Sequence, residues 1–297
     1  MKILNFGSLN IDHVYQMDHF VAAGETEHSF AYDRHMGGKG LNQSVALARA
    51  GAEVWHAGCV GADGAHLTAY LESAGVHTDY LKTVDVPTGH AIIQVDKRGQ
   101  NCIILFGGAN QAVTAAQAAE TLAHFEKGDI LLLQNEISAL GDLIRLAHAR
   151  GMRIALNPSP ATTALTELPL EMVEWFILNE VEGEQLTGQT DPVAITGSLM
   201  ARYPGCRVVL TLGKRGVMYR DEFVCRVHGI YDVPVVDTTA AGDTFTGFFL
   251  AGAAAGLPVE TLLENASKAS SIAITKPGAA QSIPTMEEVR TTEMVLV

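Results

Sequence analysis

The chain has few of the residues that mark a disulfide-rich, zinc-binding or thiol redox protein. Its 297 residues include four cysteines, Cys59, Cys102, Cys206 and Cys225, and no C-x-x-C pair occurs among them. Scattered cysteines give neither a zinc site nor a disulfide framework, which favours a reducing cytoplasm as the location. The 11 histidines form no H-x-x-x-H or H-E-x-x-H pair, so a helical zinc motif is also absent.

Basic charge is scarce as well. Twenty Lys and Arg residues against 33 Asp and Glu residues leave a formal net charge of −13. The surface therefore lacks the positive field that attracts a nucleic-acid backbone or anionic lipid, and we expect neither as a partner. A phosphate compound can still bind, because backbone N–H groups at a helix start supply positive potential locally.

Long hydrophobic runs are missing. The most apolar stretch, residues 248–259, is interrupted by glycine and proline and is far shorter than the roughly 20 residues of a membrane helix. The first residues, MKILNFGSLNID, turn polar too early for a signal peptide. We therefore expect no targeting segment and no membrane span.

The apolar runs that are present alternate between strand and helix character. Buried strands are predicted at residues 2–7, 53–60, 129–133, 153–156, 175–178 and 207–212. Helices are predicted at residues 41–50, 140–150, 241–256 and 259–275. This alternation predicts an α/β fold with a central, mostly parallel sheet that helices cover on both faces. Because no repeat or linker is visible, we expect one domain over residues 1–297.

Other segments have the pattern of antiparallel strands. Residues 13–34 and 88–106 predict short strands with polar turns, and Gly99 lies in the turn of the second segment. We expect them to form a small antiparallel lid, because ligands of α/β sheets bind at the carboxyl ends of the strands and need water excluded. The alternative is an edge extension of the main sheet. A further hairpin, 216–227, is predicted to lead into a strand at 233–236.

Small residues precede an aspartate at the start of the apolar helix 241–256, in the segment DTTAAGDTF. The N–H groups of Ala241, Gly242 and Asp243 can point at one spot, with the positive end of the helix dipole behind them. Such an anion hole can hold a phosphoryl group while the carboxylate of Asp243 accepts a proton from an attacking hydroxyl. The alternative is that Asp243 merely caps the helix.

A glycine-rich segment, GGKGLN at 37–42, directly precedes another predicted helix. It is not a Walker A loop, because Gly40 follows Lys39 where Ser or Thr is required, and no G-x-G-x-x-G occurs in the chain. Bare backbone here can approach a polyol, and Asn42 offers both a donor and an acceptor. The alternative is a plain turn.

The segment GSLNID at 7–12 follows the first predicted strand. Asn10 and Asp12 are two residues apart, so they point to the same side of an extended chain. Amide and carboxylate groups suit sugar hydroxyls, which both donate and accept hydrogen bonds. The alternative is an Asx turn that leaves the strand.

These three segments, in this order, resemble the PfkB carbohydrate kinase family, and the resemblance runs along essentially the whole chain. DTTAAGD matches the family signature D-T-x-[GA]-A-G-D, and GGKGLN fits G-G-x-G-x-N. The segments AGETEHS, GGANQAVT, LNPSPA and ITKPGAAQSIP are most similar to the ribokinase branch of the family.

The resemblance implies ATP-dependent phosphorylation of a small sugar at its primary hydroxyl, and most of all conversion of D-ribose to ribose 5-phosphate. The alternatives are a kinase for fructose, deoxyribose or a nucleoside, and a non-catalytic sugar- or nucleotide-binding regulator on the same fold. Phosphosugars are less expected, because the lid segments offer only Arg34, Lys97 and Arg98 to hold a second phosphate.

The resemblance also implies roles for individual residues. Asp243 would be the base, beside an anion hole of Ala241 and Gly242. The residues implied in sugar binding are Asn10, Asp12, Gly38, Lys39, Asn42, Glu136 and Asp243. Those implied in nucleotide binding are Asn179, Thr211, Gly213, Lys214, Gly216, Gly242 and Ser267. Serine at 267 stands where some ribokinases have a histidine that contacts adenine.

Two ions are implied by the same resemblance. Glu182, in the segment NEVE, would act on Mg²⁺ through water, and K⁺ would be an activator, as the resemblance implies. The residues implied around K⁺, chiefly through backbone oxygens, are Asp237, Thr239, Ala273, Lys276, Gly278 and Ser282. Taken without the resemblance, Glu136 can be surface charge, Asn179 and Glu182 a helix start, and 211–216 a simple turn.

The lid segments suggest a homodimer. The apolar faces of GHAIIQV and NCIILF suit pairing between two copies of the chain, as in ribokinases, which often pair through their lid strands. A lone histidine of the lid, His13, His28 or His90, is a candidate for touching the substrate. Met36 is expected to pack rather than to bind.

Overall fold

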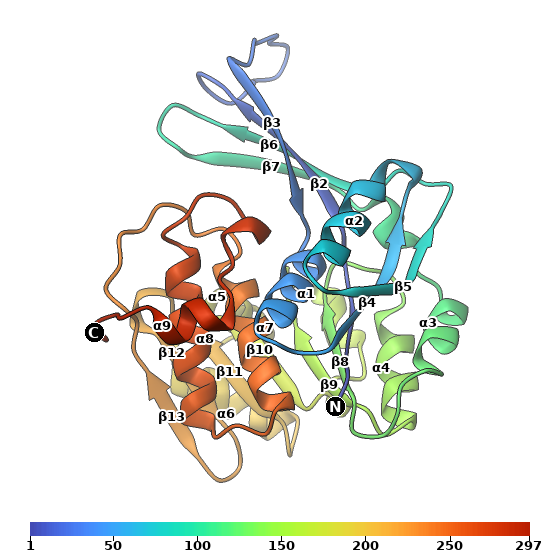
Figure 1. Ribbon diagram of the computed structural model, residues 1–297, viewed down its shortest axis with the longest axis vertical. Helices are drawn as coiled ribbons and strands as arrows, with labels where there is room; N and C mark the ends of the chain where they lie inside the picture. Colours follow the sequence, from blue (N-terminus) through green and yellow to red (C-terminus); the bar gives the residue numbers. More distant parts are fainter.

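The computed structural model describes residues 1–297 and contains two separate sheets (Figure 1). The larger sheet has nine strands in the order β13-β12-β11-β10-β9-β8-β1-β4-β5. The bounds of these strands are β1 Ile3–Phe6, β4 Val54–Val60, β5 His77–Thr83, β8 Ile130–Gln134, β9 Arg153–Asn157, β10 Trp175–Asn179, β11 Arg207–Thr211, β12 Val217–Arg220 and β13 Cys225–His228. Neighbouring strands from β5 to β11 are parallel, and only β12 and β13 join antiparallel. The predicted α/β fold is confirmed.

Helices cover both faces of this sheet. Along β8, Ile130 and Leu132 belong to one core cluster of 33 buried residues, and Leu131 and Leu133 belong to a second cluster of 32. Successive side chains of a strand point to opposite faces, so the near-equal clusters mean that both faces are buried. This explains why the strands read as continuous apolar runs rather than as alternating ones.

One face carries α1 (Lys39–Arg49), α2 (Ala65–Ser73), α7 (Ala241–Ala254), α8 (Val259–Ala273) and α9 (Met286–Thr291). The other face carries α3 (Ala115–Leu122), α4 (Leu140–Ala149), α5 (Glu180–Thr187) and α6 (Pro192–Arg202). No helix combines the length and the apolar composition that crossing a bilayer requires. The helices α1 and α7 pack side by side, which brings two of the segments singled out in the sequence together.

The smaller sheet has four strands in the order β3-β2-β6-β7 and projects away from the main body (Figure 1). Its strands are β2 Asn10–Gln16, β3 Ala31–Gly37, β6 Gly89–Val95 and β7 Asn101–Phe106. Each hairpin, β2 with β3 and β6 with β7, is antiparallel, and β2 pairs with β6 in parallel. It is a separate sheet and not an edge extension of the larger one. Its first hairpin is longer than the predicted segment 13–34, because it begins at Asn10 and ends at Gly37.

The prediction of a strand at 233–236 is wrong, because these residues have irregular structure. Pro234 lacks the N–H that a sheet ladder needs, and the N–H of Val236 donates instead to the carbonyl of Ile274 at the end of α8 (2.8 Å). The sheet therefore ends at β13, and the following segment runs to the start of α7. Strand β5 was not predicted, because its sequence HTDYLKT is half-exposed and polar.

Candidate active site

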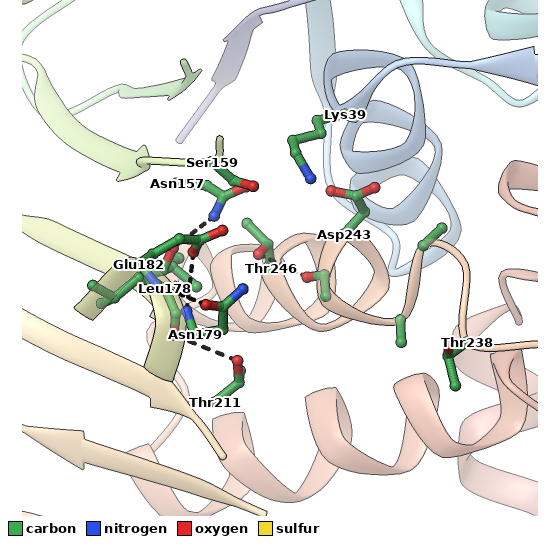
Figure 2. A pocket seen from close by; sticks show the side chains of 14 residues that line it. Lys39, Asn157, Ser159, Leu178, Asn179, Glu182, Thr211, Thr238, Asp243 and Thr246 are labelled. Carbon is green, nitrogen blue, oxygen red and sulfur yellow. Dashed lines mark hydrogen bonds between the residues drawn. The ribbon is translucent and has the colours of Figure 1, made fainter. Parts of the chain in front are cut away.

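A cavity of about 240 Å³ lies at the carboxyl ends of β9, β10 and β11, against the first turns of α1 and α7 (Figure 2). Ligands of open α/β sheets bind at this edge. Predicted residues of the sugar side, the nucleotide side and the anion hole line the same cavity: Lys39, Asn179, Glu182, Thr211, Ala241, Gly242 and Asp243. The fold thus joins segments that are about 200 residues apart in the sequence.

Helix α7 begins with a sharp turn at Ala240, which has a left-handed φ of 59°. The N–H of Ala241 donates to the carbonyl of Thr238 (3.2 Å), whereas those of Gly242 and Asp243 have no acceptor within the protein. A Cβ added at Gly242 would meet no atom within 4 Å. The donors open to an anion are therefore Gly242 and Asp243, and the N–H of Ala241, predicted to take part, is already occupied here.

The carboxylate of Asp243 is buried and is held by two side-chain amides of α1. Asn42 Nδ2 donates to Asp243 Oδ2 (2.9 Å), and Gln43 Nε2 donates to Asp243 Oδ1 (2.8 Å). No backbone N–H of α7 donates to this carboxylate, so Asp243 is not a helix cap. Its side chain is instead held at the cavity wall, as a base for a bound hydroxyl has to be.

Lys39, the first residue of α1, supplies positive charge to the cavity, and its side chain points toward Asp243 (Figure 2). Burial opposes the charge of its ammonium group, but the carboxylates of Asp243, Glu136 and Glu182 outweigh this and raise the pKa of Lys39. The ammonium group therefore stays charged. It gives the cavity a local positive charge in a protein whose net charge is −13.

Glu136 follows β8 and is tied to the start of α1. Its Oε2 accepts hydrogen bonds from the N–H of Lys39 (3.1 Å) and from the hydroxyl of Ser8. Burial raises the pKa of Glu136, although Lys39 and Ser8 act in the opposite direction. The alternative of ordinary surface charge does not fit these contacts.

Asn10 and Asp12 lie in β2, where the smaller sheet meets the main body. Asn10 Oδ1 accepts a hydrogen bond from Asn110 Nδ2 (2.8 Å). Burial, together with the nearby carboxylate of Glu136, raises the pKa of Asp12 to about 6. Asn42 Oδ1 is buried without a partner, and a buried amide oxygen of this kind needs a hydrogen-bond donor. A polyhydroxylated ligand would supply one.

The glycines of GGKGLN serve close packing of backbone on backbone. Gly38 has a φ of 93°, and a Cβ there would lie 3.0 Å from the N of Asn10 and from the O of Ser8. A Cβ at Gly40 would lie 2.3 Å from the N of Ser8. These glycines let α1 start against the end of β1, so they are explained without a ligand, and a sugar contact of Gly38 stays a prediction.

The residues predicted to bind the nucleotide begin where β10 becomes α5. Asn179 caps α5, and its Oδ1 accepts the N–H of Glu182 (2.9 Å) while Glu182 Oε2 accepts the N–H of Asn179 (3.0 Å). The predicted helix start is therefore a full capping box. Glu182 still lines the cavity, so its remaining carboxylate oxygen can face water or a hard cation such as Mg²⁺.

The segment after β11 turns through a short 3₁₀ helix, Gly213–Arg215, into β12. Gly216 has a φ of 87°, and a Cβ there would lie 2.0 Å from the carbonyl of His228, so packing alone requires glycine. No other residue packs against Gly213 in this way. Ser267 is buried on α8, one turn before Ser270, whose hydroxyl donates to the carbonyl of Ala241 (2.9 Å). Nucleotide contacts of Gly213, Lys214, Gly216 and Ser267 stay predictions.

The residues implied around K⁺ come from two loops that the carboxylate of Asp237 joins. Asp237 Oδ1 accepts from the N–H and the hydroxyl of Thr239 (2.9 and 2.7 Å), and Oδ2 accepts from the N–H of Gly278 (2.9 Å). Although burial opposes it, these donors lower the pKa of Asp237. The side chain of Lys276 points elsewhere, to Glu288 (3.1 Å). A site for K⁺ in these loops stays a prediction.

Sequence reasoning missed the polar residues that support the site from behind. Gln43 and Asn157 contact each other, and Asn157 and Ser159 line the cavity. The signal was present in the segments LNPSPA and GGANQAVT, which contain Asn157 and Asn110. Gln43 carried a different signal, a polar residue on a helix whose first two turns are almost entirely buried.

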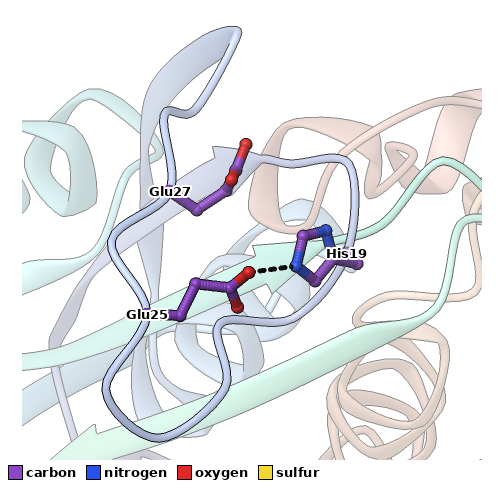
Figure 3. Close-up of side chains that lie close together, drawn as sticks. All are labelled: His19, Glu25 and Glu27. Atoms are coloured by element: carbon purple, nitrogen blue, oxygen red, sulfur yellow. Dashed lines mark hydrogen bonds and ion pairs between the residues drawn. The ribbon is translucent and has the colours of Figure 1, made fainter.

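The histidines of the smaller sheet lie outside the cavity. His13 stacks on Tyr32 and meets His90 edge to face. Near the tip, His19, Glu25 and Glu27 gather in one loop (Figure 3). His19 Nε2 bonds to Glu25 Oε1 (2.9 Å), and Glu25 Oε2 accepts the N–H of Ala22 (2.8 Å). These bonds all stay within the loop, so they explain its shape without a ligand.

The whole chain matches known carbohydrate kinases. The family described as pfkB family carbohydrate kinase matches residues 1–286. A ribokinase of Haemophilus influenzae is 35% identical over 291 residues, which cover 95% of this chain and 95% of that protein. The structure of a Cryptococcus neoformans ribokinase in complex with ADP is 33% identical with a TM-score of 0.85, covering 97% of this chain and 98% of that one. The structure of Arabidopsis thaliana ribokinase complexed with ribose and ATP is 28% identical with a TM-score of 0.86, covering 97% of each chain.

Proposed function

This chain belongs to the pfkB family of carbohydrate kinases, and we propose that its reaction is the ATP-dependent phosphorylation of D-ribose to ribose 5-phosphate. One observation carries the proposal. The carboxylate of Asp243, the unpaired N–H groups of Gly242 and Asp243, and the residues at the end of β10 share one cavity. A base, an anion hole and a nucleotide side within one cavity are the parts that phosphoryl transfer to a hydroxyl needs.

The chemistry follows from these positions. The carboxylate of Asp243 takes the proton of the primary hydroxyl of the sugar, and the oxygen attacks the γ-phosphorus of ATP in line with the leaving group. The bond between the γ-phosphorus and the β-γ bridging oxygen breaks, so the products are the sugar phosphate, ADP and one proton. The N–H groups of Gly242 and Asp243 and the ammonium of Lys39 hold the oxygens of the phosphoryl group as it moves.

We propose that the sugar is held from the other side by Asn10, Asp12, Gly38, Asn42 and Glu136. The unpartnered Oδ1 of Asn42 and the carboxylates of Asp12 and Glu136 are acceptors, and sugar hydroxyls are donors. Asn10 and Asp12 belong to β2, so the smaller sheet carries part of the proposed sugar site. We assign this sheet the role of a lid within one kinase domain, because these proposed sugar-binding residues lie at its base.

We propose that the nucleotide lies along Asn179, Thr211, Gly213, Lys214, Gly216 and Ser267, with Mg²⁺ held through water by Glu182. When bound, Mg²⁺ would neutralise charge on the phosphate oxygens. We propose K⁺ as an activator in the loops around Asp237, where the carboxylate already orders both segments. An ion there would steady the turn that aims the first N–H groups of α7.

We also propose a homodimer that pairs through the lid. All six residues of β7 are exposed, and Ile103, Ile104 and Leu105 are 49%, 60% and 62% exposed. Consecutive exposed apolar residues on a sheet are typical of an interaction surface. A cytoplasmic location is part of the same proposal, supported by ATP as the substrate and by the exposed free thiols of Cys102 and Cys225.

The test is a substrate panel with ATP and Mg²⁺, run with and without K⁺. It includes D-ribose, deoxyribose, fructose and a nucleoside, and ADP formation is followed by a coupled assay. We expect kcat/KM for ribose to exceed every other value at least about tenfold, since a site built for a hydroxyl rejects an analogue that lacks it. A different preferred sugar would replace ribose in the proposal. If no compound of the panel leads to ADP formation, a binding-only regulator is favoured.

A further inference from the structure

Gln43 lies directly behind the catalytic carboxylate, in a position that no ligand reaches. Its side chain is fully buried (0% exposed) on α1. Its Nε2 donates to Asp243 Oδ1 (2.8 Å) and to Asn157 Oδ1 (2.9 Å), and its Oε1 accepts from Gln134 Nε2 (2.7 Å). Every hydrogen-bonding group of this amide except one acceptor lone pair is therefore used.

The orientation of this amide is fixed by chemistry. An ionised carboxylate only accepts hydrogen bonds, so the Gln43 atom that faces Asp243 must be the NH₂ group. The oxygen of Gln43 then faces Gln134, which must donate. Gln134 Nε2 donates further to Asn5 Oδ1 (2.9 Å). Each amide in the row is thus turned in one direction by the charge at its end.

The row continues to the far side of α1. Asn5 Nδ2 donates to Ser44 Oγ (2.8 Å), whose hydroxyl must then donate to His56 Nδ1 (2.8 Å). Burial lowers the pKa of His56 to about 4, so its ring is neutral and its proton sits on Nε2, next to the carbonyl of Gly7 (3.2 Å). Gln134 thus donates in both directions, toward Gln43 and Asp243 on one side and toward Asn5 on the other, and Asn5 and Ser44 donate onward, away from Asp243. None of these amides can turn over without placing two donors or two acceptors against each other.

Asn42, the other amide on this carboxylate, is free in a way that Gln43 is not. Its Nδ2 donates to Asp243, but its Oδ1 has no partner in the protein. Asn42 therefore keeps an acceptor that a ligand hydroxyl can use. Gln43 has no such unpartnered oxygen, because Asn157 and Gln134 hold it from both sides. The two neighbouring amides have different tasks, one toward the ligand and one toward the base.

We propose that Gln43 is a positioning residue for phosphoryl transfer: its locked amide donates to Oδ1 of Asp243 and keeps the carboxylate aimed at the bound hydroxyl. This rests on the proposed function of Asp243 as the base. The charged groups near this carboxylate are Lys39 on α1 and Glu136 after β8, and Glu182 on α5 acts on Lys39. None of the three forms a hydrogen bond with Gln43. Changing Gln43 thus alters the base without removing a neighbouring charge.

The first test is Gln43→Met, which keeps the length of the side chain but cannot donate. We expect kcat for ribose to fall about 10- to 100-fold, because misplacing a reacting group by about 1 Å can cost that much. KM for ribose and for ATP should change less than about threefold, since Gln43 touches neither. The acidic limb of the pH profile of kcat should move to higher pH, because a donor to the ionised form is lost.

The second test is Gln43→Glu, which keeps the shape and replaces the donor with a second carboxyl group. Two carboxyl groups in contact share a proton near neutral pH. We therefore expect the acidic limb to move further than in Gln43→Met, so that activity rises with pH over a range where the wild type is level. The pH of the acidic limb should therefore rise from the wild type to Gln43→Met and further to Gln43→Glu. This order is specific to a role of Gln43 at the base. Equal acidic limbs in all three proteins would overturn the proposal.

Gln117→Met is the matched control. Gln117 is also a buried glutamine (4% exposed), and its amide bonds to Gly58 O (2.9 Å) and to the thiol of Cys59 (3.2 Å), away from the cavity. We expect Gln117→Met to lower the free energy of unfolding and to leave the acidic limb of the pH profile of kcat unchanged. If Gln43→Met behaves like this control, with lower stability and an unchanged limb, Gln43 is only structural.

A readout without turnover separates this proposal from the proposed function. The ¹³C resonance of the Asp243 carboxyl, assigned by its loss in Asp243→Asn, is titrated in the wild type and in both Gln43 variants. We expect the midpoint to rise in the same order as the acidic limb. If wild type phosphorylates no sugar but the midpoint still moves, the proposed function fails and the Gln43–Asp243 link stands. An unmoved midpoint overturns the link itself.

Discussion

The two sheets of this protein are built on opposite principles. The nine-stranded sheet is buried on both faces by helices, and its central strands have almost no exposed atoms. The four-stranded sheet meets helices only at its base, where β3 contacts α1 and β6 contacts the 3₁₀ helix at Gly108–Ala112, and β7 is exposed at every residue. One sheet is stabilised by its own layers, whereas the other exposes an apolar strand. Asp243, the proposed base, lies in the first turn of α7, which packs on the first sheet, and Asp12, a proposed sugar-binding residue, lies in the second sheet.

The largest effect expected from this division is on the base, which the rigid body carries. We expect Asp243→Ala to lower kcat at least about a hundredfold, because general bases contribute about 10²- to 10⁴-fold. Folding should be intact, since the change removes a buried charge whose amide partners can bind water. The measurement is steady-state kinetics with ribose, alongside thermal unfolding. Asp142→Ala, on the exposed side of α4, is the control, and near-normal turnover of Asp243→Ala would contradict the assignment.

The next effect compares the packing of the two sheets directly. Phe249 on α7 is fully buried against the main sheet, whereas Leu105 in β7 is 62% exposed. We expect Phe249→Ala to lower the free energy of unfolding by about 3 to 5 kcal/mol, and Leu105→Ala by less than about 0.5 kcal/mol. Urea unfolding of the two variants measures both values at a concentration where the chain is monomeric. Similar losses would mean that the lid is packed more tightly than its exposure indicates.

A third prediction concerns Asp12, where binding works against stability. The pKa of Asp12 is about 6 in the folded chain and 3.8 in an ordinary environment, so the folded state binds this proton more tightly than the unfolded state. The buried carboxylate therefore costs stability above pH 6, and the cost vanishes below pH 4. We expect Asp12→Asn to raise the free energy of unfolding by about 3 kcal/mol at pH 8 and to leave it unchanged at pH 4.

The same variant should lose function at the pH where it gains stability. Asp12→Asn removes an acceptor for a sugar hydroxyl, so kcat/KM for ribose at pH 8 should fall while the unfolding curve moves to higher urea. Unfolding curves at the two pH values measure the gain in stability, and initial rates at pH 8 measure the loss in kcat/KM. A variant that is no more stable at pH 8 than the wild type would show that burial of Asp12 is not costly.

The smallest effect on folding is expected at the lid surface. Ile104 is 60% exposed, so Ile104→Lys should change the free energy of unfolding of the monomer by less than about 0.5 kcal/mol. It should nevertheless break the proposed dimer, because a charge would enter an apolar interface. Light scattering at several concentrations measures the mass. A wild-type protein that is already monomeric would contradict the dimer, and a dimeric Ile104→Lys would place the interface elsewhere.

The sequence predicted most strands of the main sheet, for a physical reason. Strands buried on both faces are continuous apolar runs such as ILLL before Gln134, and these are visible without knowing their neighbours. In the smaller sheet the hairpin of GHAIIQV and NCIILF was predicted correctly, whereas the segment 13–34 fell inside the longer hairpin of β2 and β3. At 233–236 the apolar residues looked like another strand, but Pro234 and the carbonyl of Ile274 decided otherwise.

The sequence identified several residues of the candidate site, but it did not predict which hydrogen bonds they form. Asp243, Lys39, Glu182 and Thr211 were all singled out, and all line one cavity. The N–H of Ala241 was expected to be free, yet the turn at Ala240 brings it to the carbonyl of Thr238. Gln43 was not singled out, because a buried glutamine has no spacing rule that marks it.

The sequence by itself determined the fold class, the kinase family and the chemical types present at the site, because apolar periodicity and short glycine-rich segments are local properties of a chain. Only the tertiary structure decided which amide meets which oxygen. Asn42 and Gln43 are neighbours in sequence, 200 residues before Asp243, and both bond to its carboxylate. That one of them is locked and the other free follows from Gln134 and Asn157, which reach α1 only when the parallel strands are assembled.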